Sequence, residues 1–595
     1  MKFVKKNYLF LIFIVSSLIN SILLLFLTTG CNNIKFILFD LVILLFISSF
    51  SFLVKRRTLY FLIFSIILTF ICCANSLYYN NYNDFASVYL LETSLQALML
   101  PSEAVTGVFN AVDFIFIWQI ILFIFLYRKN KYEREFNNFK CCFLYCFGLL
   151  VISILTINNN DLYRLKNDWN KAYVVRNFGI YTYQLKDMFY VGSKFICKDC
   201  GKEEAKILID EFYNNKKIDT NQYTDIFKDK NVLFIHAESV QSLYLNSEIN
   251  GQEITPNLNK LANEGLYFSN YYSQESVGTS SDTEFVVTNS ILPIGTGTVF
   301  INYDDNNYQS MVKAFKQKGY YTFSMHGNIC NYWNRNKMYQ SIGYDHFYCY
   351  DAYDLTDQIG LGLSDKSFFS QSADIISDIS NNYDHFYGTL IMLTNHTPFY
   401  NDGKVSFDVD YMEGTKMGDY IKLLHYSDEA IGEFIAKLDN LGVLDDTVIV
   451  IYGDHDAKFS IKDYEYYLKK DIDFYEYEKI TRVPLIIWTK DNLVKGNIDK
   501  VMGSYDLMPT LGNMFDFDYP YALGNDIFSV DDNIVVFPNG NWLTDKIYYN
   551  NQLSEYKKYS DVSEEYIASK EDYARDIIEI SNSLIRYNLF EDKYN

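Results

Sequence analysis

The stretch Asn231-Val-Leu-Phe-Ile-His-Ala-Glu-Ser-Val-Gln241 contains an apolar strand that stops abruptly at polar side chains. Its four apolar residues, Val232 to Ile235, are typical of a short strand inside a sheet. The polar residues His236, Glu238 and Ser239 follow at the carboxyl end, where open α/β sheets bind their ligands. A carboxylate in that place is a hard oxygen ligand for a metal ion. Taken alone, the stretch also fits a helix N-cap region, where Glu and Ser are common.

A second strand ends in the same way. Thr447-Val-Ile-Val-Ile-Tyr-Gly-Asp-His455 is apolar until Gly453, which lets the backbone turn sharply, and it then presents Asp454 and His455. A carboxylate and an imidazole together suit a divalent transition metal such as Mn²⁺ or Zn²⁺. The alternative is an ordinary polar turn. Because Glu238 also follows a strand, we expect the two strand ends to form one site.

Gly278-Thr-Ser-Ser-Asp-Thr-Glu-Phe285 offers a nucleophile. A glycine followed by hydroxyl residues can place a hydroxyl and free N–H groups at a helix N-terminus, which is a good phosphate site. A metal would lower the pKa of such a hydroxyl and activate it for covalent catalysis. An N-cap run with Glu284 closing a capping box is the structural alternative, and the two interpretations are compatible.

The 595 residues fall into two parts of unlike composition. Up to about Ile157 long apolar runs dominate, whereas beyond Asp161 the patterns are mixed. The formal net charge of −21 excludes a general electrostatic affinity for nucleic acid. From Lys230 onward, strands alternate with helices, which predicts an α/β domain with a doubly wound, mostly parallel sheet. Strands are expected at Val232–Ile235, Tyr321–Met325, Thr389–Leu393, Thr447–Tyr452 and Val483–Trp488, and helices at Pro256–Gly265, Tyr308–Lys318, Phe368–Asn381 and Tyr420–Leu441.

Five apolar runs in the first part approach the ~20 residues that a membrane-spanning helix needs. Lys and Arg lie before the first run, between the second and third and between the fourth and fifth, whereas the connections Thr28–Asn33 and Tyr78–Gly107 have none. The N-terminus is therefore predicted to be cytoplasmic, and an odd number of spans places the later residues outside the cell. The first run is long and no small-x-small site follows it, so we do not expect a cleaved signal peptide. The predicted spans are Tyr8–Leu27, Ile34–Val54, Leu59–Leu77, Val108–Tyr127 and Cys141–Ile157.

Two acids, Asp40 and Asp113, fall inside these runs, toward the outer helix ends of the predicted topology. Acids within a membrane are functional candidates by default. An acid that simply reaches the interface is the equally simple alternative.

The expected domains are a five-span transmembrane domain at 1–157, a juxtamembrane helical linker at 158–229 and an extracellular domain at 230–595. In the linker, Tyr173–Phe189 predicts helices near the outer membrane surface, with Trp169 and the tyrosines at headgroup level. Glu203–Asn215 predicts an amphipathic helix. After Asp531 the pattern is less regular, which favours a small C-terminal subdomain with its own sheet.

Four of the ten cysteines lie in the predicted outer part. Cys197-x-x-Cys200 has no second pair, so it is a weak zinc signal and also fits an oxidised pair or two thiols. Cys330 and Cys349 are candidates for a disulfide in the oxidising exterior.

Together these residues resemble a known family. Glu238, the hydroxyl run and the Gly-Asp-His stretch are similar to the alkaline phosphatase/sulfatase superfamily, as are Thr255–Gly265 and Asp506–Leu511. More narrowly, the apolar runs combined with three further motifs look like lipoteichoic acid synthase and its relatives. The three motifs are Met325-His-Gly-Asn-Ile-Cys-Asn-Tyr-Trp-Asn-Arg335, Gly343-Tyr-Asp-His-Phe-Tyr348 and Leu393-Thr-Asn-His-Thr-Pro-Phe399.

The resemblance implies an activity: such enzymes take phosphoglycerol from phosphatidylglycerol and add it to a glycerol-phosphate polymer outside the cell. It implies a Mn²⁺ site, with Mg²⁺ or Zn²⁺ as alternatives, made of a hydroxyl nucleophile and three further ligands. It also implies that a second group of residues holds the phosphoglycerol, and His236 is expected near the pocket rim, within reach of substrate. The implied ligands besides the nucleophile are Glu238, Asp454 and His455, and the implied substrate residues are His326, Trp333, Arg335 and His396.

This chain departs from the family pattern in two places. The family commonly has Gly-Lys-Thr-Ser-Asp-x-Glu-Phe, and alignment without gaps puts Ser280 at the nucleophile and Thr279 at the Lys. We therefore expect Ser280 to be the nucleophile, with Thr279 as the second candidate. Asn328, which we also expect among the substrate-binding residues, stands where the family's loop often has Asp. Loss of a Lys and an Asp could mean a different acceptor or polymer.

Two other functions are compatible with the sequence. Within enzymes, the protein could transfer phosphoethanolamine or hydrolyse phosphate or sulfate esters, although it has no Cys-x-Pro-x-Arg sequence of the sulfatase kind. From another class, it could be an inactive membrane-anchored binding or scaffold protein. No Ala-x-Ala lies between Ile157 and Lys230, so we expect the protein to stay anchored in the cell membrane.

Overall fold

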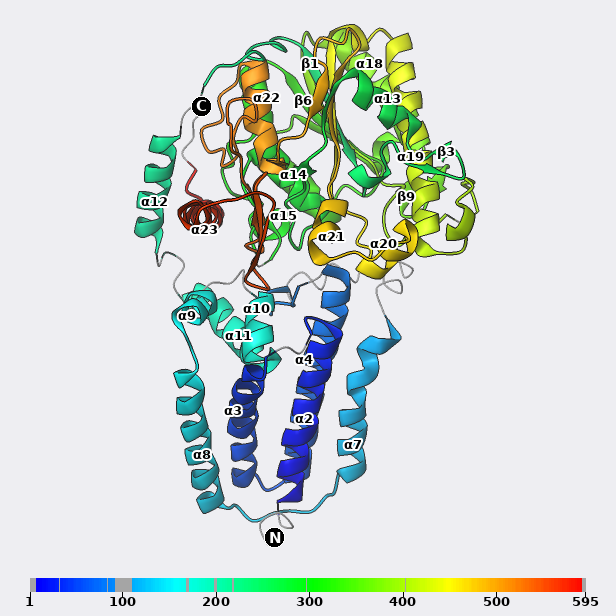
Figure 1. Ribbon diagram of the computed structural model, residues 1–595. Coiled ribbons are helices and arrows are strands. Elements are labelled where there is room, and N and C mark those ends of the chain that lie inside the picture. The colour runs from blue at the N-terminus through cyan, green and yellow to red at the C-terminus, as the bar shows by residue number, and fades with distance from the viewer. Residues whose placement is uncertain are drawn as a thin grey trace. The chain divides into compact units, whose positions relative to one another are not determined.

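The computed structural model divides into two compact units (Figure 1). The first comprises Met1–Lys198 with Asn551–Leu553, and the second comprises Asp199–Asn550 with Ser554–Asn595. Cys197, Cys200 and Trp169, which figure in the sequence-based predictions, lie outside the residues that the structure describes. The described residues are 7–30, 33–82, 84–90, 110–166, 171–196, 199, 201–216, 219–295, 297–401 and 403–590.

Among the described residues, four helices of the first unit are long and apolar enough to cross a membrane. They correspond to four of the five predicted spans. The remaining one, predicted at 108–127, is a shorter apolar segment in which a 3₁₀ helix, η2 (Ala111–Ile117), leads into α7 (Trp118–Leu126). The four long helices are α2 (Tyr8–Leu27), α3 (Lys35–Ser49) with its continuation η1 (Phe50–Leu53), α4 (Arg57–Tyr82) and α8 (Phe136–Leu155).

Gln119 connects the short helix α7 to its neighbours. Its amide oxygen accepts hydrogen bonds from Asn20 Nδ2 of α2 at 2.9 Å and from the Thr69 hydroxyl of α4 at 3.3 Å. Its amide nitrogen donates to the Ser17 hydroxyl at 2.7 Å. Hydrogen bonds of this kind hold apolar helices together, because lipid offers the same groups no partner. Polar side chains therefore fix α7 within the bundle despite its length.

The two acids in the apolar runs, Asp40 and Asp113, are buried and hydrogen-bonded. The Asp40 carboxylate accepts the Tyr181 N–H at 3.1 Å and the Ser21 hydroxyl at 2.5 Å. Tyr181 lies in the first turn of α11 (Ile180–Ile196), where a carboxylate stabilises the helix. Asp113 accepts side-chain hydrogen bonds from α4 at 2.7 Å. Both contacts join separate helices, which accounts for these acids structurally.

Helices occupy most of the described part of the predicted linker. The predicted amphipathic helix is confirmed as α12 (Lys202–Asn215), which buries Ala205 and Ile209. It packs against α23 (Glu564–Tyr587) of the same unit. The helices before it, all in the first unit, are α9 (Asn159–Lys166), α10 (Lys171–Phe178) and α11.

Strand β1 (Asn231–Ala237) lies near the middle of an eight-stranded sheet. It runs parallel to β10 (Phe386–Ile391) on one side and to β11 (Thr447–Gly453) on the other. Every residue of β10 and β11 is buried, as is typical of parallel strands covered on both faces. The full order is β13 (Gly496–Ile498), β4 (Leu266–Phe268), β12 (Leu485–Thr489), β11, β1, β10, β6 (Tyr321–His326) and β7 (His346–Tyr348).

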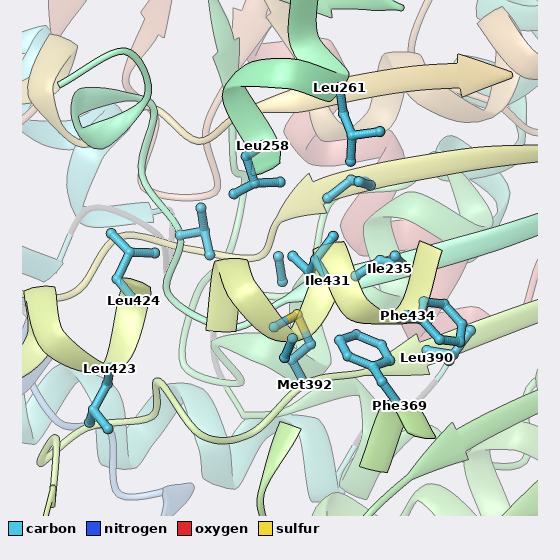
Figure 2. Packing of buried hydrophobic residues seen from close by; sticks show 14 of the residues in the cluster. Ile235, Leu258, Leu261, Phe369, Leu390, Met392, Leu423, Leu424, Ile431 and Phe434 are labelled. Carbon is cyan, nitrogen blue, oxygen red and sulfur yellow. The ribbon is translucent and has the colours of Figure 1, made fainter. Parts of the chain in front are cut away.

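Three helices cover one face of this sheet: α13 (Pro256–Glu264), α18 (Asp365–Asn382) and α19 (Lys416–Asn440). Their apolar side chains meet those of the central strands in a continuous core (Figure 2). Full burial of each such side chain stabilises the fold by about 1.5–3 kcal/mol. Figure 2 labels Leu258 and Leu261 of α13, Phe369 of α18, Ile431 and Phe434 of α19, and Ile235 and Leu390 of the strands.

Aromatic rings fill the opposite face of the sheet. The Phe315 ring of α16 (Met311–Gln317) lies 5.1 Å from the ring of Tyr387 in β10. It also lies 5.2 Å from the Phe515 ring of α22 (Leu507–Phe515). Helices therefore cover the sheet on both faces, which confirms the predicted doubly wound architecture.

The predicted strands and helices of the second unit are all present, with ends that differ by at most four residues. The strands β4, β7 and β13 were not predicted, because three residues are too few to show an alternating pattern. The predicted C-terminal sheet is confirmed as four antiparallel strands. They are β15 (Val535–Val536), β16 (Trp542–Leu543), β17 (Ile547–Asn550) and β18 (Glu555–Lys558).

Gly453, the last residue of β11, is explained by close packing and not by the sharp turn that the sequence suggested. A Cβ atom there would lie 2.2 Å from the Val240 carbonyl oxygen and 2.8 Å from Val483 Cβ. The segment that follows Glu238 can approach β11 only because this position has no side chain.

We predict that Gly453→Ala destabilises the second unit by about 1–3 kcal/mol, because the added methyl group has no space. Thermal unfolding of the full-length protein in detergent measures the change. Gly442→Ala is the control for the loss of a glycine, since a Cβ atom at that position would meet nothing within 4 Å, although its φ of 73° carries a backbone cost of its own. An unfolding temperature for Gly453→Ala equal to the wild type would contradict this explanation.

Candidate active site

The carboxyl ends of β1 and β11 bring two acids together. In the register of these parallel strands Ala237 pairs with Gly453, so that Glu238 and Asp454 leave the sheet side by side. His455 follows directly. One oxygen of each carboxylate and one nitrogen of the imidazole all lie within 4.8 Å of one another. We call Glu238, Asp454 and His455 the acidic cluster; each of these residues is at most 5% exposed.

The Ser280 hydroxyl joins the acidic cluster. Its Oγ lies 3.2 Å from His455 Nε2 and 3.5 Å from Glu238 Oε2. Ser280 is the first residue of α14 (Ser280–Asn289), so the hydroxyl stands at a helix N-terminus. Thr279 occupies the N-cap position with φ of 44°, and its side chain does not cap the helix. Of the two predicted hydroxyls, Ser280 is the one that the structure brings to the acids.

A second layer holds Asp454 in place. Its Oδ1 accepts the backbone N–H groups of Ser239 at 2.7 Å and of His455 at 2.8 Å. Its Oδ2 lies 3.2 Å from His236 Nε2, and His236 Nδ1 lies 3.1 Å from the Tyr452 hydroxyl. His236 is 0% exposed, so its predicted position at a pocket rim is wrong. It is buried because β1 is a central strand covered on both faces, and it orients a carboxylate instead.

The acidic cluster is electrostatically crowded. Burial, followed by the charge of Asp454, raises the pKa of Glu238 well above its ordinary value. Burial alone would raise the pKa of Asp454 too, but His455 and the hydrogen bond from His236 hold it well below its ordinary value. Two buried carboxylates, an imidazole and a hydroxyl make a donor set that fits a hard or borderline divalent cation, and such a cation would offset the repulsion between the acids.

Arg335 is buried beside α14. Its Nη2 lies 2.6 Å and its Nε 3.0 Å from Glu284 Oε1 of α14, and the Tyr339 hydroxyl donates to Glu284 Oε2 at 2.5 Å. Glu284 therefore pairs with an arginine and does not close the capping box that was the alternative interpretation. Within the described part of the protein, Arg335 Nη1 is buried without a hydrogen-bond partner. A guanidinium held on one edge has its other edge available to an anion.

His326 and His396 are two of the predicted substrate residues; His326 is the last residue of β6, and His396 lies in the segment after β10. His326 is buried, and its Nδ1 contacts the Ile391 carbonyl oxygen at 3.1 Å. Burial, then the charge of Arg335, lowers its pKa well below the ordinary value, so that the imidazole is neutral. His236 and His396 act on its pKa in the same direction, which puts His396 in the same neighbourhood. His396 is half-buried, with Nδ1 against the Thr397 carbonyl oxygen.

The other two predicted substrate residues, Asn328 and Trp333, lie on the loop between β6 and α17 (Arg335–Ile342). The Asn328 side chain is used within the loops, since it donates to the Leu361 carbonyl at 3.3 Å and accepts the Ile329 N–H at 2.7 Å. Trp333 is half-buried with φ of 56°. Ser280 contacts His455 and Glu238 of the acidic cluster. The predicted metal ligands therefore contact one another, whereas the hydrogen bonds of Asn328 remain within the loops.

One further group, Lys458, was not expected from the sequence. Its ammonium lies 2.6 Å from Asp456 Oδ1 and 2.7 Å from Glu275 Oε1. It thereby ties the segment after His455 to the segment before Ser280. Lys458 also has φ of 56°, which residues other than glycine rarely adopt. No short motif marks such a bridge, because Glu275 and Lys458 are far apart along the chain.

Comparisons with known proteins lead to the same class of protein. The Sulfatase family model matches residues 230–517, which include the whole acidic cluster and Ser280. A solved structure of a protein in the alkaline phosphatase superfamily from Vibrio parahaemolyticus shares the fold at 20% identity, with a TM-score of 0.52 over 66% of this chain and 97% of that chain. The second unit thus contains a sulfatase-like domain.

Relatives that match nearly the whole chain define the family. The lipoteichoic acid synthase of Staphylococcus saprophyticus is 32% identical over 88% of this chain and 83% of its own length. Lipoteichoic acid synthase 1 of Bacillus subtilis is 30% identical over 83% and 79%. The crystal structure of the lipoteichoic acid synthase LtaP from Listeria monocytogenes is 28% identical, with a TM-score of 0.57 over 64% of this chain and 98% of that chain. The Lipoteichoic acid synthase N-terminal domain model matches residues 1–194. The chain belongs to the lipoteichoic acid synthase family, as its motifs predicted, and is an enzyme of the sulfatase-like kind.

We predict that Glu284→Gln destabilises the protein by about 3–5 kcal/mol, because the buried Arg335 guanidinium loses its counter-charge. Glu413→Gln removes a partner of Lys422 on the surface, where Glu413 is 67% exposed, and is expected to cost less than about 1 kcal/mol. Thermal unfolding of both variants makes the comparison. Equal effects would show that the buried pair is no more important than a surface pair.

Proposed function

We propose that this protein transfers phosphoglycerol from phosphatidylglycerol to a hydroxyl group of a glycerol-phosphate polymer or glycolipid. The observation that carries the proposal is the Ser280 hydroxyl at the start of α14, 3.2 Å from His455 Nε2 and 3.5 Å from Glu238 Oε2. A hydroxyl held there is suited to receive a phosphoryl group. The names of the relatives, lipoteichoic acid synthases matched over most of their length, support phosphoglycerol as the group transferred.

Glu238, Ser280, Asp454 and His455 would hold a divalent cation. Mn²⁺ is the first choice for this mixed set of oxygen and nitrogen donors, with Mg²⁺ and Zn²⁺ as alternatives. When bound, the cation lowers the pKa of the hydroxyl and offsets the charge of the phosphoryl group. The crowding of Glu238 and Asp454 supports this assignment, because a bound cation would relieve the repulsion between the two acids.

The proposed reaction consists of two displacements at phosphorus. In the first, Ser280 Oγ loses its proton and bonds to the lipid phosphorus, the bond to the glyceride oxygen breaks, and diacylglycerol leaves after taking up a proton. In the second, the acceptor hydroxyl bonds to the same phosphorus, the Ser280 Oγ–P bond breaks, and the acceptor's proton balances the one that restores the serine. His396 is the candidate for protonating the leaving oxygen.

Arg335 is the main anchor proposed for the phosphate. Glu284 holds one edge of its guanidinium, and Nη1 remains for a phosphate oxygen. The neutral His326 imidazole adds a hydrogen-bonding group, and Trp333 would pack against the glycerol. Asn328 offers a neutral amide where the family often has a carboxylate. This difference favours an acceptor or polymer that need not match the family's.

The membrane part supports a location at the cell membrane. We propose a cytoplasmic N-terminus and an extracellular second unit, because Lys and Arg cluster in alternate connections of the apolar segments. The catalytic residues would then meet phosphatidylglycerol from the outer side of the membrane. We further propose that the protein remains anchored, since the connection after the spans has no Ala-x-Ala sequence.

We predict that Ser280→Ala lowers diacylglycerol release at least about 10³-fold, since loss of a covalent nucleophile in other enzymes costs more than this. Thr279→Ala, the matched control, should change the rate less than about tenfold. The assay uses the purified full-length proteins with fluorescent phosphatidylglycerol and Mn²⁺. If both variants release diacylglycerol at the wild-type rate, the mechanism is wrong. If only Thr279→Ala is inactive, the nucleophile is misassigned.

We also predict that Glu238→Gln weakens Mn²⁺ binding by about 10–100-fold or more, because it removes a charged ligand. Isothermal titration of the full-length protein measures binding without reference to activity. Asp374→Asn is the control, because this carboxylate is 65% exposed and pairs with a surface lysine. Wild-type affinity in Glu238→Gln would remove Glu238 from the metal site.

A further inference from the structure

The loop between β6 and α17, residues 327–334, carries two of the proposed substrate residues and ends directly before a third. Asn328 and Trp333 lie within it, and Arg335 follows. Trp333 and Asn334 have φ values of 56° and 58° in succession. Residues other than glycine keep this backbone conformation only where the surroundings impose it. Ile329 in the same loop is 55% exposed, so burial of apolar side chains contributes little to holding this part of the loop in place.

Hydrogen bonds fix the two ends of this loop. At the start, the Gly327 carbonyl accepts the Leu363 N–H at 3.3 Å and the Asn328 carbonyl accepts the Tyr350 N–H at 3.0 Å. At the end, Asn334 Nδ2 donates to the Phe300 carbonyl at 2.9 Å. The five residues 329–333 between these points include Trp333.

A covalent bond crosses the middle of the loop. Cys330 forms a disulfide with Cys349, which confirms the pairing considered from the sequence. Cys349 is 5% exposed and comes directly after β7, the last strand of the sheet. The disulfide thus ties the exposed part of the loop to the edge of the buried sheet. A cross-link of this kind removes alternative conformations that the segment would otherwise sample.

We propose that the Cys330–Cys349 disulfide is a positioning element of the substrate site. The intact disulfide holds Trp333 in the geometry that binds the phosphoglycerol headgroup, and Trp333 in turn shapes the approach to Arg335. This inference rests on the proposed function. An external dithiol reduces this bond by thiol–disulfide exchange, which leaves two free cysteine thiols and oxidises the reagent to its own disulfide. Residues 329–333 are then no longer held by the cross-link. The acidic cluster follows strands β1 and β11, and Ser280 begins α14, so the disulfide acts on substrate binding and not on the metal ligands.

An oxidising exterior suits this arrangement. The proposed topology places the second unit outside the cell, where disulfides form and persist. Cys330 is half-buried, so a small reductant can reach the bond from the loop side. The affinity for lipid substrate would then depend on the redox state of one pair of cysteines.

The test compares the wild type with Cys330→Ser/Cys349→Ser in the full-length protein, using diacylglycerol release from phosphatidylglycerol vesicles. We expect KM to rise about tenfold, equivalent to about 1.4 kcal/mol of lost binding, with kcat within about twofold and Mn²⁺ affinity unchanged. Wild-type protein treated with dithiothreitol should show the same rise in KM, and reoxidation should reverse it. Cys141→Ser, which removes an exposed cysteine elsewhere, is the control and should behave as the wild type.

A second readout does not depend on activity. Hydrogen exchange of the amides at 329–333 should be faster in the double variant and in the reduced wild type, whereas exchange at 280–289 should be unchanged. An unaltered KM together with unaltered exchange would overturn the inference. A loss of kcat and of Mn²⁺ affinity in both the double variant and the reduced wild type would overturn it as well, because the disulfide would then support the whole domain. If the untreated wild type releases no diacylglycerol, the proposed function itself has failed.

Discussion

The parallel pairing of β1 with β11 is the constraint on which the site depends. It places Glu238 and Asp454 next to each other at the buried carboxyl ends of two central strands, where the two carboxylates repel each other and neither is hydrated. The rest of the local structure compensates for this arrangement. Backbone N–H groups and two imidazoles favour the charged form of Asp454, while Glu238 is left with a raised pKa. A site built in this way fits a divalent cation and an anionic substrate, although the whole protein carries a net charge of −21.

The elements around the site are joined by buried polar contacts between distant parts of the chain. Glu284 of α14 holds Arg335, and Lys458 bridges the segments on either side of the site. Removal of Glu284 would leave the Arg335 guanidinium as an unpaired buried charge. The helix that presents Ser280 is therefore coupled through Glu284 to the arginine that would hold phosphate, and loss of this ion pair is expected to displace both.

Much of the fold could be predicted because the central strands are long apolar runs that end in polar residues. The strand-end rule located Glu238, Asp454 and His455, and a gap-free alignment of the hydroxyl run pointed to Ser280. What failed depends on three-dimensional neighbours. His236 is buried because β1 is covered on both faces, a glycine is required at 453 by the Val240 carbonyl, and Glu284 pairs with Arg335 across 51 positions. The strands β4, β7 and β13 carry too few residues for a periodic signal.

In the proposed mechanism, Ser280 carries the phosphoglycerol group between donor and acceptor. Peptide mass spectrometry tests this step directly, on full-length protein quenched shortly after mixing with phosphatidylglycerol and Mn²⁺ without an acceptor. We expect a phosphoglycerol adduct on the peptide that contains Thr279 and Ser280, assigned by fragmentation to Ser280. Release of diacylglycerol with no adduct on this peptide at any time would contradict the mechanism, because the group would then pass to water or to an acceptor without the serine.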